Sequence, residues 1–406
     1  MSTSGLSRRG FLKGVAAAAG ALGATRLMGG RLVAPAYAAD PVEAPAALLF
    51  YMRGGYNALF CSADSFLGNG AFGVRDGNVL RVKQSGLYVD RNSLGTLSAS
   101  TLAHMASIGV KHGISQHPAA QANLWMKGKR SRPIMLSAAL GGDAALRCVT
   151  VGANEPPGNH RAEGGVSMQY VRDLSTTIAA LGGTTKAGAP RRELAASGLA
   201  VSEAMSAGRL TPNPTSGASL IEGYPAAVAM LSDQAQSFDY AEIATAYGVK
   251  PNANGEYPTV VKGVRMHFVA AEIMIRAGAN VVIIENRGWD THKDRNGSQV
   301  RNMMQGRRIP QMLKVFTDRT LAMQNRNVVT TLFGDFSRSL PGSDHQANLT
   351  ATVIGKYVKL GTTGRVNARV GLPAGTPGIE GYWAYLAAAL KCPEKPFGNN
   401  PHGLVL

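Results

Sequence analysis

The chain has few cysteines, few aromatic residues and few acids, and no long hydrophobic run follows its N-terminal region. Its three cysteines are Cys61, Cys148 and Cys392, none in a C-x-x-C pair, which excludes a disulfide framework and a zinc knuckle. One disulfide and three buried thiols both remain open. Without a later run long enough to cross a bilayer, we expect no transmembrane segment in the mature chain.

Acidic residues are outnumbered, with 25 Asp and Glu against 42 Lys and Arg and a net charge of +17. The first 38 residues carry five of the positive charges and no acid, so the remainder carries about +12. Such a surface favours anionic partners, such as phosphate or sulfate esters, acidic polysaccharides or lipid headgroups. No dense basic run with interleaved aromatics and no recognisable DNA- or RNA-binding motif is present, so we expect no nucleic-acid partner.

The N-terminal residues match an export signal. The string Ser7-Arg8-Arg9-Gly10-Phe11-Leu12-Lys13 fits the twin-arginine pattern, and an apolar stretch rich in Ala and Gly follows at 14–24. Ala36-Tyr37-Ala38 offers a cleavage site, so residues 1–38 are the predicted signal peptide. We expect the twin-arginine translocase to export the protein to the periplasm or beyond.

Alternating helical and strand patterns predict an α/β fold with a doubly wound, mostly parallel sheet. The expected strands are 46–52, 108–111, 133–136, 148–151, 279–285 and 327–333. The expected helices are 98–107, 119–126, 259–277, 302–325 and 381–390. Residues 39–154 and 256–406 would form the two parts of the core. Residues 155–255, rich in Gly, Pro, Ser and Thr, would form an insertion or cap with helical pieces near 191–208 and 224–247.

The string Gly288-Trp289-Asp290-Thr291-His292 directly follows the strand 279–285. Ligands of open α/β sheets lie beyond the carboxyl ends of the strands, so Asp290 and His292 stand where chemistry usually occurs. A polar turn whose Trp packs on the sheet explains the same string equally well.

A second group of polar residues follows the strand 327–333. It comprises Asp335, Arg338, Asp344 and His345. If the two strands are neighbours, both groups meet at one edge of the sheet. Mixed carboxylate and imidazole ligands suit zinc, manganese, magnesium or calcium. A network of helix caps and ion pairs is the structural alternative.

Three strings together resemble a known family. They are Arg53-Gly54-Gly55, Gly288-Trp289-Asp290-Thr291-His292 and Ser343-Asp344-His345. They resemble the exported bacterial proteins called the domain of unknown function 1501 family, remote relatives of the alkaline phosphatases and sulfatases. The resemblance spans roughly residues 45–150 and 255–406. It implies an alkaline-phosphatase-like core with a metal-assisted ester hydrolase site at the strand ends.

The chain departs from that pattern at several positions. Asn57 stands where family members carry an acid, although its carbonyl can still bind a metal. Pro118 occupies the position of the nucleophile and cannot attack, so His117 or Ser115 would have to replace it. His402 is either the third metal-binding histidine of the alkaline phosphatase pattern or a solvated C-terminal residue. The absence of a C-x-P-x-R string argues against a formylglycine-dependent sulfatase.

These observations leave two main hypotheses. The first is an exported metal-dependent hydrolase of small or polymeric phosphate or sulfate esters. Its predicted metal ligands are Asp290, His292, Asp344, His345 and Asn57. Arg338 would hold the anionic group, with Ser115, His117 or water as the nucleophile. The second is a non-catalytic relative that binds an anionic envelope polymer or a protein partner. A metal carrier is disfavoured by the few cysteines and the lack of His-rich or Met-rich tracts.

Overall fold

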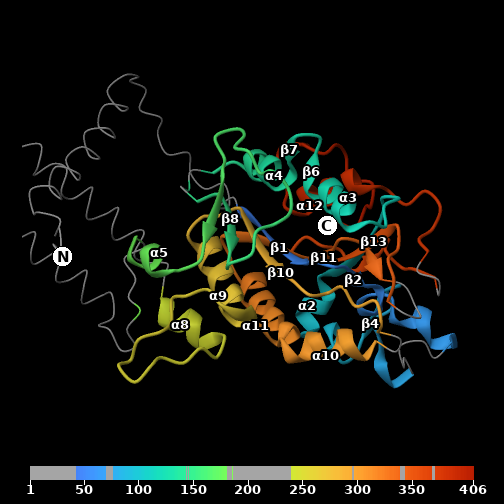
Figure 1. Ribbon diagram of the computed structural model, residues 1–406, viewed down its shortest axis with the longest axis horizontal. Helices are drawn as coiled ribbons and strands as arrows, with labels where there is room; N and C mark the ends of the chain where they lie inside the picture. Colours follow the sequence, from blue (N-terminus) through green and yellow to red (C-terminus); the bar gives the residue numbers. More distant parts are fainter. Residues whose placement is uncertain are drawn as a thin grey trace, which may run out of the picture. The chain divides into compact units, whose positions relative to one another are not determined.

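An eight-stranded sheet organises the part of the chain that the computed structural model describes (Figure 1). The described residues are 43–69, 76–142, 144, 146–180, 185, 239–294, 297–338, 343–367 and 371–406. The predicted signal peptide and the predicted helical piece near 191–208 lie outside them.

The strand order of the sheet is β14-β5-β13-β11-β1-β10-β8-β9. The strands are β1 (Ala44–Met52), β5 (Met105–Lys111), β8 (Cys148–Val151), β9 (Met168–Val171), β10 (Val281–Asn286), β11 (Arg326–Gly334), β13 (Asn348–Gly355) and β14 (Gly361–Thr362). Only β13 runs antiparallel to its neighbours, β11 and β5. The predicted doubly wound, mostly parallel α/β sheet is therefore confirmed.

The strand β1 lies in the middle of the sheet between β10 and β11. Its residue Ala47 pairs with Val281 on one side and with Val329 on the other. All six residues of β10 are buried, as expected for a strand covered on both faces. The assumption that the strands ending before Asp290 and Asp335 are direct neighbours was wrong, because β1 separates them.

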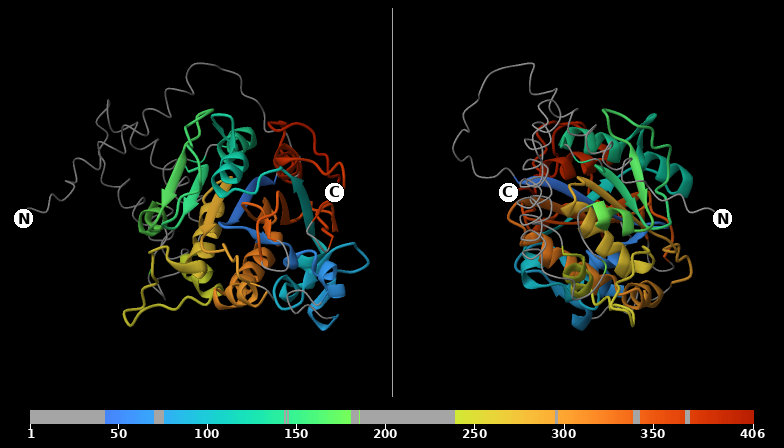
Figure 2. Two further views of the ribbon diagram at one scale, coloured as in Figure 1. Left: turned by 45° about the vertical axis from the view of Figure 1, so that its right-hand side comes forward. Right: turned by 90° about the vertical axis from the view of Figure 1, so that its left-hand side faces the viewer.

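Helices cover both faces of the sheet (Figures 1 and 2). On one face lie α3 (His117–Trp125), α4 (Arg132–Leu140) and α12 (Ile379–Ala389); on the other lie α2 (Ala99–Ala103), α9 (Gly263–Arg276) and α11 (Ile309–Leu321). Consecutive β1 residues illustrate the two faces. The Phe50 ring stacks on Phe268 of α9 at 5.5 Å, whereas the Tyr51 ring meets Trp125 of α3 edge-on at 5.1 Å.

Shorter elements complete the described residues. The helices are α5 (Ser175–Ala180), α8 (Tyr240–Ala246) and α10 (Ser298–Gly306), with 3₁₀ turns η1 (Ala58–Phe60), η2 (Ala63–Asn69), η4 (Asp76–Asn78) and η5 (Leu94–Thr96). Small two-stranded pairs join β2 (Tyr56–Asn57) to β12 (Ser337–Arg338), β3 (Val79–Arg81) to β4 (Tyr88–Asp90), and β6 (Met126–Lys127) to β7 (Arg130–Ser131).

Several predicted element boundaries were wrong. Residues 133–136, predicted as a strand, lie inside α4, since a short apolar run does not by itself distinguish strand from helix. The helix predicted over 98–107 ends at Ala103, and β5 begins at Met105. The helix predicted over 302–325 is two helices, α10 and α11, separated where Arg308 adopts a left-handed conformation.

Part of the predicted insertion belongs to the sheet. The strand β9, within 155–255, pairs in parallel with β8 as an edge strand. All three cysteines are unpaired, Cys61 and Cys148 buried and Cys392 partly so, which contradicts the disulfide alternative. Among the described residues, no helix has the length and apolarity needed to span a bilayer.

Candidate metal centre

The carboxyl ends of β1, β10 and β11 meet at one edge of the sheet through close backbone contact. Gly54 follows β1 with a φ of +114°. A Cβ atom there would lie 2.5 Å from the backbone nitrogen of Asp290 and 2.8 Å from the carbonyl carbon of Trp289. Only glycine permits this approach, which fixes Asp290 beside the end of β1.

Four side chains converge at this edge. They are His117 at the start of α3, Asp290 and His292 after β10, and His345 before β13. One potential ligand atom from each lies within 4.8 Å of all the others. The nearest imidazole nitrogens of His292, His117 and His345 lie 3.0, 3.5 and 3.7 Å from Oδ1 of Asp290. We call these four residues the His/Asp cluster.

Hydrogen bonds at the far nitrogens orient two of the imidazoles. His345 Nδ1 donates to the carbonyl oxygen of Ser115 at 2.7 Å, and His117 Nδ1 donates to Asp335 Oδ2 at 2.5 Å. The Nε2 atoms of both residues are buried and have no hydrogen-bond partner. A carboxylate or carbonyl behind a histidine, with the other nitrogen unsatisfied, is the arrangement of metal-binding histidines. The donor set therefore fits a divalent cation.

Asp335 orients His117 and lies outside the cluster itself. Its buried carboxylate accepts hydrogen bonds from the Tyr51 hydroxyl and, at 2.9 Å, from Gln121 Nε2, besides the bond from His117. The bond to Asp335 raises the pKa of His117 above its ordinary value. Burial, with the Asp335 charge in addition, raises the pKa of Tyr51 well above its usual range, so Tyr51 remains a donor.

Arg338 is buried beneath the cluster and its guanidinium is directed at protein acceptors. It donates to the carbonyl oxygens of Gly54 and Ser343, the latter at 2.8 Å, and to Oδ1 of Asp290. Its side chain is only 1% exposed. In this arrangement Arg338 positions Asp290, and its predicted contact with a substrate anion stays a prediction.

Partial burial raises the pKa of Asp290, but Arg338 and the nearby imidazoles together outweigh it and hold the pKa below its ordinary value. Burial lowers the pKa of His345, and the positive charges of Arg338 and the other imidazoles lower it further. The cluster thus offers an ionised carboxylate and an imidazole biased toward its neutral form, the states in which both residues bind metals.

Two of the predicted ligands lie outside the cluster. Asp344 is exposed; one oxygen accepts from the backbone nitrogen of His345 and lies 3.4 Å from His292 Nδ1. Asn57 is buried and its Oδ1 caps η1 by accepting from the Leu59 nitrogen at 2.9 Å. Their predicted metal binding stays a prediction, while Asp344 already contacts the cluster through His292.

The predicted nucleophile candidates differ in their placement. The carbonyl oxygen of Ser115 accepts the hydrogen bond from His345 Nδ1. Pro118 is the second residue of α3, where a proline fits sterically. His117 belongs to the His/Asp cluster. His402 is buried rather than solvated, hydrogen-bonded to Thr363 Oγ1 at 2.8 Å, so its reading as a solvated residue was wrong.

The cluster borders a hollow of about 250 Å³ that also exposes Arg53 and Arg287. Sequence reasoning did not assign these arginines, nor Tyr51 and Gln121, although it singled out the string that begins at Arg53. Trp289 is buried and donates to Asn286 Oδ1 at 2.8 Å, so it packs on the sheet while Asp290 and His292 face the cluster. The buried Trp289 agrees with the interpretation as a polar turn, and the chemical role of Asp290 and His292 stays a prediction.

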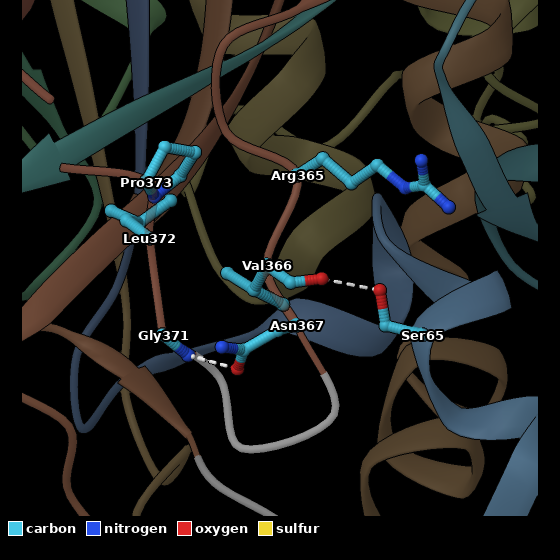
Figure 3. Close-up of a pocket in the computed structure, with 7 residues that line it drawn as sticks. All are labelled: Ser65, Arg365, Val366, Asn367, Gly371, Leu372 and Pro373. Atoms are coloured by element: carbon cyan, nitrogen blue, oxygen red, sulfur yellow. Dashed lines mark hydrogen bonds between the residues drawn. The ribbon is translucent and has the colours of Figure 1, made fainter.

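A second hollow, of about 450 Å³, lies between η2 and the segment around Val366 (Figure 3). Two of its polar side chains are paired within the protein: Ser65 donates to the Val366 carbonyl, and Arg365 forms an ion pair with Asp64. No histidine lines it, whereas the first hollow is lined by His117, whose buried Nε2 has no hydrogen-bond partner, so the first hollow is the better candidate site.

Comparison with known proteins adds little to this geometry. No known protein-family profile matches the chain, and no curated protein matches it. Two solved structures of alkaline phosphatase from the Antarctic bacterium TAB5 align with it, one of them a His-to-Glu mutant with bound Mg. They are 10% and 9% identical, cover 87% of this chain and 100% of their own, and have TM-scores of 0.28. At these scores the likeness carries no argument about fold or function.

Proposed function

We propose that this protein is an exported, metal-dependent hydrolase of phosphate or sulfate esters. The observation that carries the proposal is the pair of buried Nε2 atoms of His117 and His345, which have no hydrogen-bond partner and lie beside Asp290 and His292. Buried polar atoms without hydrogen-bond partners are costly, so their convergence with Asp290 and His292 at the sheet edge favours a bound cation. The sequence resemblance to relatives of the alkaline phosphatases supports the same class of reaction.

Three imidazoles and one carboxylate favour zinc among the candidate metals, because magnesium and calcium prefer oxygen ligands. When bound, such a cation supplies Lewis acidity that polarises an ester oxygen. Asp335 and the Ser115 carbonyl hold the Nε2 atoms of His117 and His345 toward the centre. Arg338 holds Asp290 in place, and an oxygen of a carboxylate has lone pairs for both partners.

Export supplies the setting for this activity. The twin-arginine pattern at 7–13 favours folding before export, and the excess of basic residues favours an anionic substrate outside the inner membrane. The substrate would be a small or polymeric ester.

A non-catalytic anion-binding protein is the second candidate. Pro118, at the position that the resemblance assigns to the nucleophile, is the observation that favours it. In the hydrolase, Ser115 after a shift of its loop, His117 or water would have to attack.

Hydrolysis of p-nitrophenyl phosphate and p-nitrophenyl sulfate by the purified mature chain tests the proposal. We expect turnover of at least one ester that is lost on chelation, restored by zinc, and abolished in Asp290→Ala. The matched control is His160→Gln, because His160 bonds to Ser131 away from the cluster. Metal binding without turnover of either ester would favour the non-catalytic alternative.

A further inference from the structure

Two arginines enter the hollow beside the His/Asp cluster from two different strand ends. Arg53 follows β1, and Arg287 follows β10. Both line the same hollow of about 250 Å³ as His117 and Asp290. Their side chains are 35% and 53% exposed, so solvent or a ligand reaches both guanidinium groups.

One buried carboxylate holds both arginines. Glu285, the residue before the last one of β10, has a side chain that is 0% exposed. Its Oε1 accepts from Arg53 Nη1 at 3.1 Å and from Arg287 Nε at 2.6 Å. A buried carboxylate is costly unless paired, so Glu285 fixes the two guanidinium groups. One negative charge against two positive charges leaves the trio with a net charge of +1.

Most N–H groups of the two guanidinium groups have no acceptor within the described part of the chain. A guanidinium carries five N–H donors, and each of these two side chains donates a hydrogen bond only to Glu285 there. Arg338 is the opposite case, since its donors are directed at two carbonyls and Asp290. Arg53 and Arg287 are therefore better placed than Arg338 for the predicted contact with an anion.

The size of the hollow limits what it accepts. Sites for drug-sized ligands have volumes of roughly 300–1,000 Å³, so a hollow of about 250 Å³ suits one charged group of a larger molecule. Paired arginines match the oxygens of phosphate and sulfate through parallel hydrogen bonds. We propose that Arg53 and Arg287 bind the phosphate or sulfate group of the substrate in this hollow, and that Glu285 is their positioning residue. This inference rests on the proposed function for the identity of the substrate.

Titration calorimetry with inorganic phosphate and sulfate tests the inference on the full mature chain, first stripped of metal and then loaded with zinc. We expect Arg53→Gln to weaken anion binding by about tenfold in the metal-free protein, since charge-assisted hydrogen bonds are lost. Arg287→Gln should weaken it less, because Arg287 is more exposed. The double variant should abolish binding to the metal-free protein.

The matched control is Arg130→Gln, which removes the same charge from an exposed pair with Glu163 outside the hollow. It should bind phosphate as the unaltered protein does. Equal binding by the double variant and the unaltered protein would overturn the inference. Equal losses in Arg130→Gln and Arg53→Gln would overturn it too, because net charge alone would then explain the effect.

Glu285→Gln tests the positioning role, since it keeps the size of the side chain and removes the charge. We expect weaker phosphate binding in folded protein, with partial rescue in Glu285→Asp. A role in folding alone would lower the unfolding temperature and leave the affinity for phosphate unchanged, which would contradict the positioning role.

Elemental analysis of the same variants separates this inference from the proposed function. Retained zinc with lost phosphate binding in the double variant supports the inference. Phosphate binding that depends on the two arginines in a protein that binds no zinc would sustain the anion site and overturn the hydrolase. Zinc-dependent turnover with unchanged KM in the double variant would sustain the hydrolase and overturn the anion site.

Discussion

Two groups of charged and polar side chains in this protein differ in how completely their buried atoms are hydrogen-bonded. Glu272 of α9 is fully buried and accepts from the Tyr247 hydroxyl at 2.8 Å, from Arg276 and from Arg319. Arg319 in turn forms two bonds with Glu242. In the His/Asp cluster, by contrast, two buried imidazole nitrogens have no hydrogen-bond partner.

This difference distinguishes a structural ion-pair network from a candidate metal-binding site. The Glu272 network pairs its buried carboxylate on both oxygens and joins α8, α9 and α11, so it needs no ligand. The His/Asp cluster leaves its acceptors pointed at one another, an arrangement that a cation would stabilise. We make four predictions, in decreasing order of effect; three test this contrast and one concerns a histidine outside both groups.

Removing one imidazole should weaken metal binding most. His345→Phe keeps a ring next to Phe336, whose centroid lies 4.3 Å from that of His345, and removes the nitrogen. A quarter of the roughly 10–16 kcal/mol of a four-ligand zinc site is about 2.5–4 kcal/mol. Competition with a chromophoric chelator measures this loss. Unchanged zinc affinity in His345→Phe would show that His345 is not a metal ligand.

Removing the central carboxylate of the Glu272 network should affect stability instead. Glu272→Ala removes the acceptor of Arg276 and of the Tyr247 hydroxyl and leaves Arg319 paired with Glu242 alone, which should cost about 3 kcal/mol of unfolding free energy. Urea unfolding measures this change, and zinc affinity measured in parallel should stay constant. A loss of zinc in Glu272→Ala without a loss of stability would reverse the contrast.

A histidine away from both groups should make stability depend on pH. Burial lowers the pKa of His267 to about 4, so the folded protein holds the ring neutral while the unfolded chain protonates near pH 6.5. The unfolded state therefore binds more protons between pH 6.5 and 4, and stability falls as pH falls through this window.

Between pH 7 and pH 5, the preferential protonation of His267 in the unfolded chain should lower the free energy of unfolding by about 2 kcal/mol. Unfolding by urea at several pH values should show that His267→Gln loses about that much less than the unaltered protein. Parallel pH profiles for the two proteins would refute the assignment to His267.

The carboxylate behind His117 should give the smallest effect. Asp335→Asn keeps one acceptor oxygen, so we expect zinc affinity about tenfold weaker, at the lower end of the range for partners of metal-binding histidines. Chelator competition again measures the affinity. A loss as large as in His345→Phe would indicate that Asp335 binds the metal directly.

The sequence predicted the parts of the fold that repeat a simple pattern. The strands that became β1, β8, β10 and β11 are apolar runs between helices, and their burial on both faces follows from that order. It did not predict that β1 lies between β10 and β11, because chain order does not determine sheet order. The antiparallel strand β13 was not expected either, because it interrupts the alternation of helix and strand.

The site was predicted where residues follow strands directly. Asp290 and His292 directly follow β10, and His345 was proposed from the polar group that comes later after β11. His117 came only through the resemblance, because the start of α3 reaches the cluster through packing. The burial of Arg338 could not be predicted. It depends on the turn at Gly54 and on the Ser343 carbonyl, contacts between segments far apart in the sequence.

Elemental analysis of the mature chain, purified untagged without chelators, tests the central claim most directly. The account predicts about one equivalent of a divalent metal, with zinc favoured, that is lost in His345→Phe and retained in Glu272→Ala. Metal-free protein that neither takes up zinc at micromolar concentration nor gains thermal stability from it would contradict the claim, and would leave the His/Asp cluster as an unsatisfied part of an anion-binding surface.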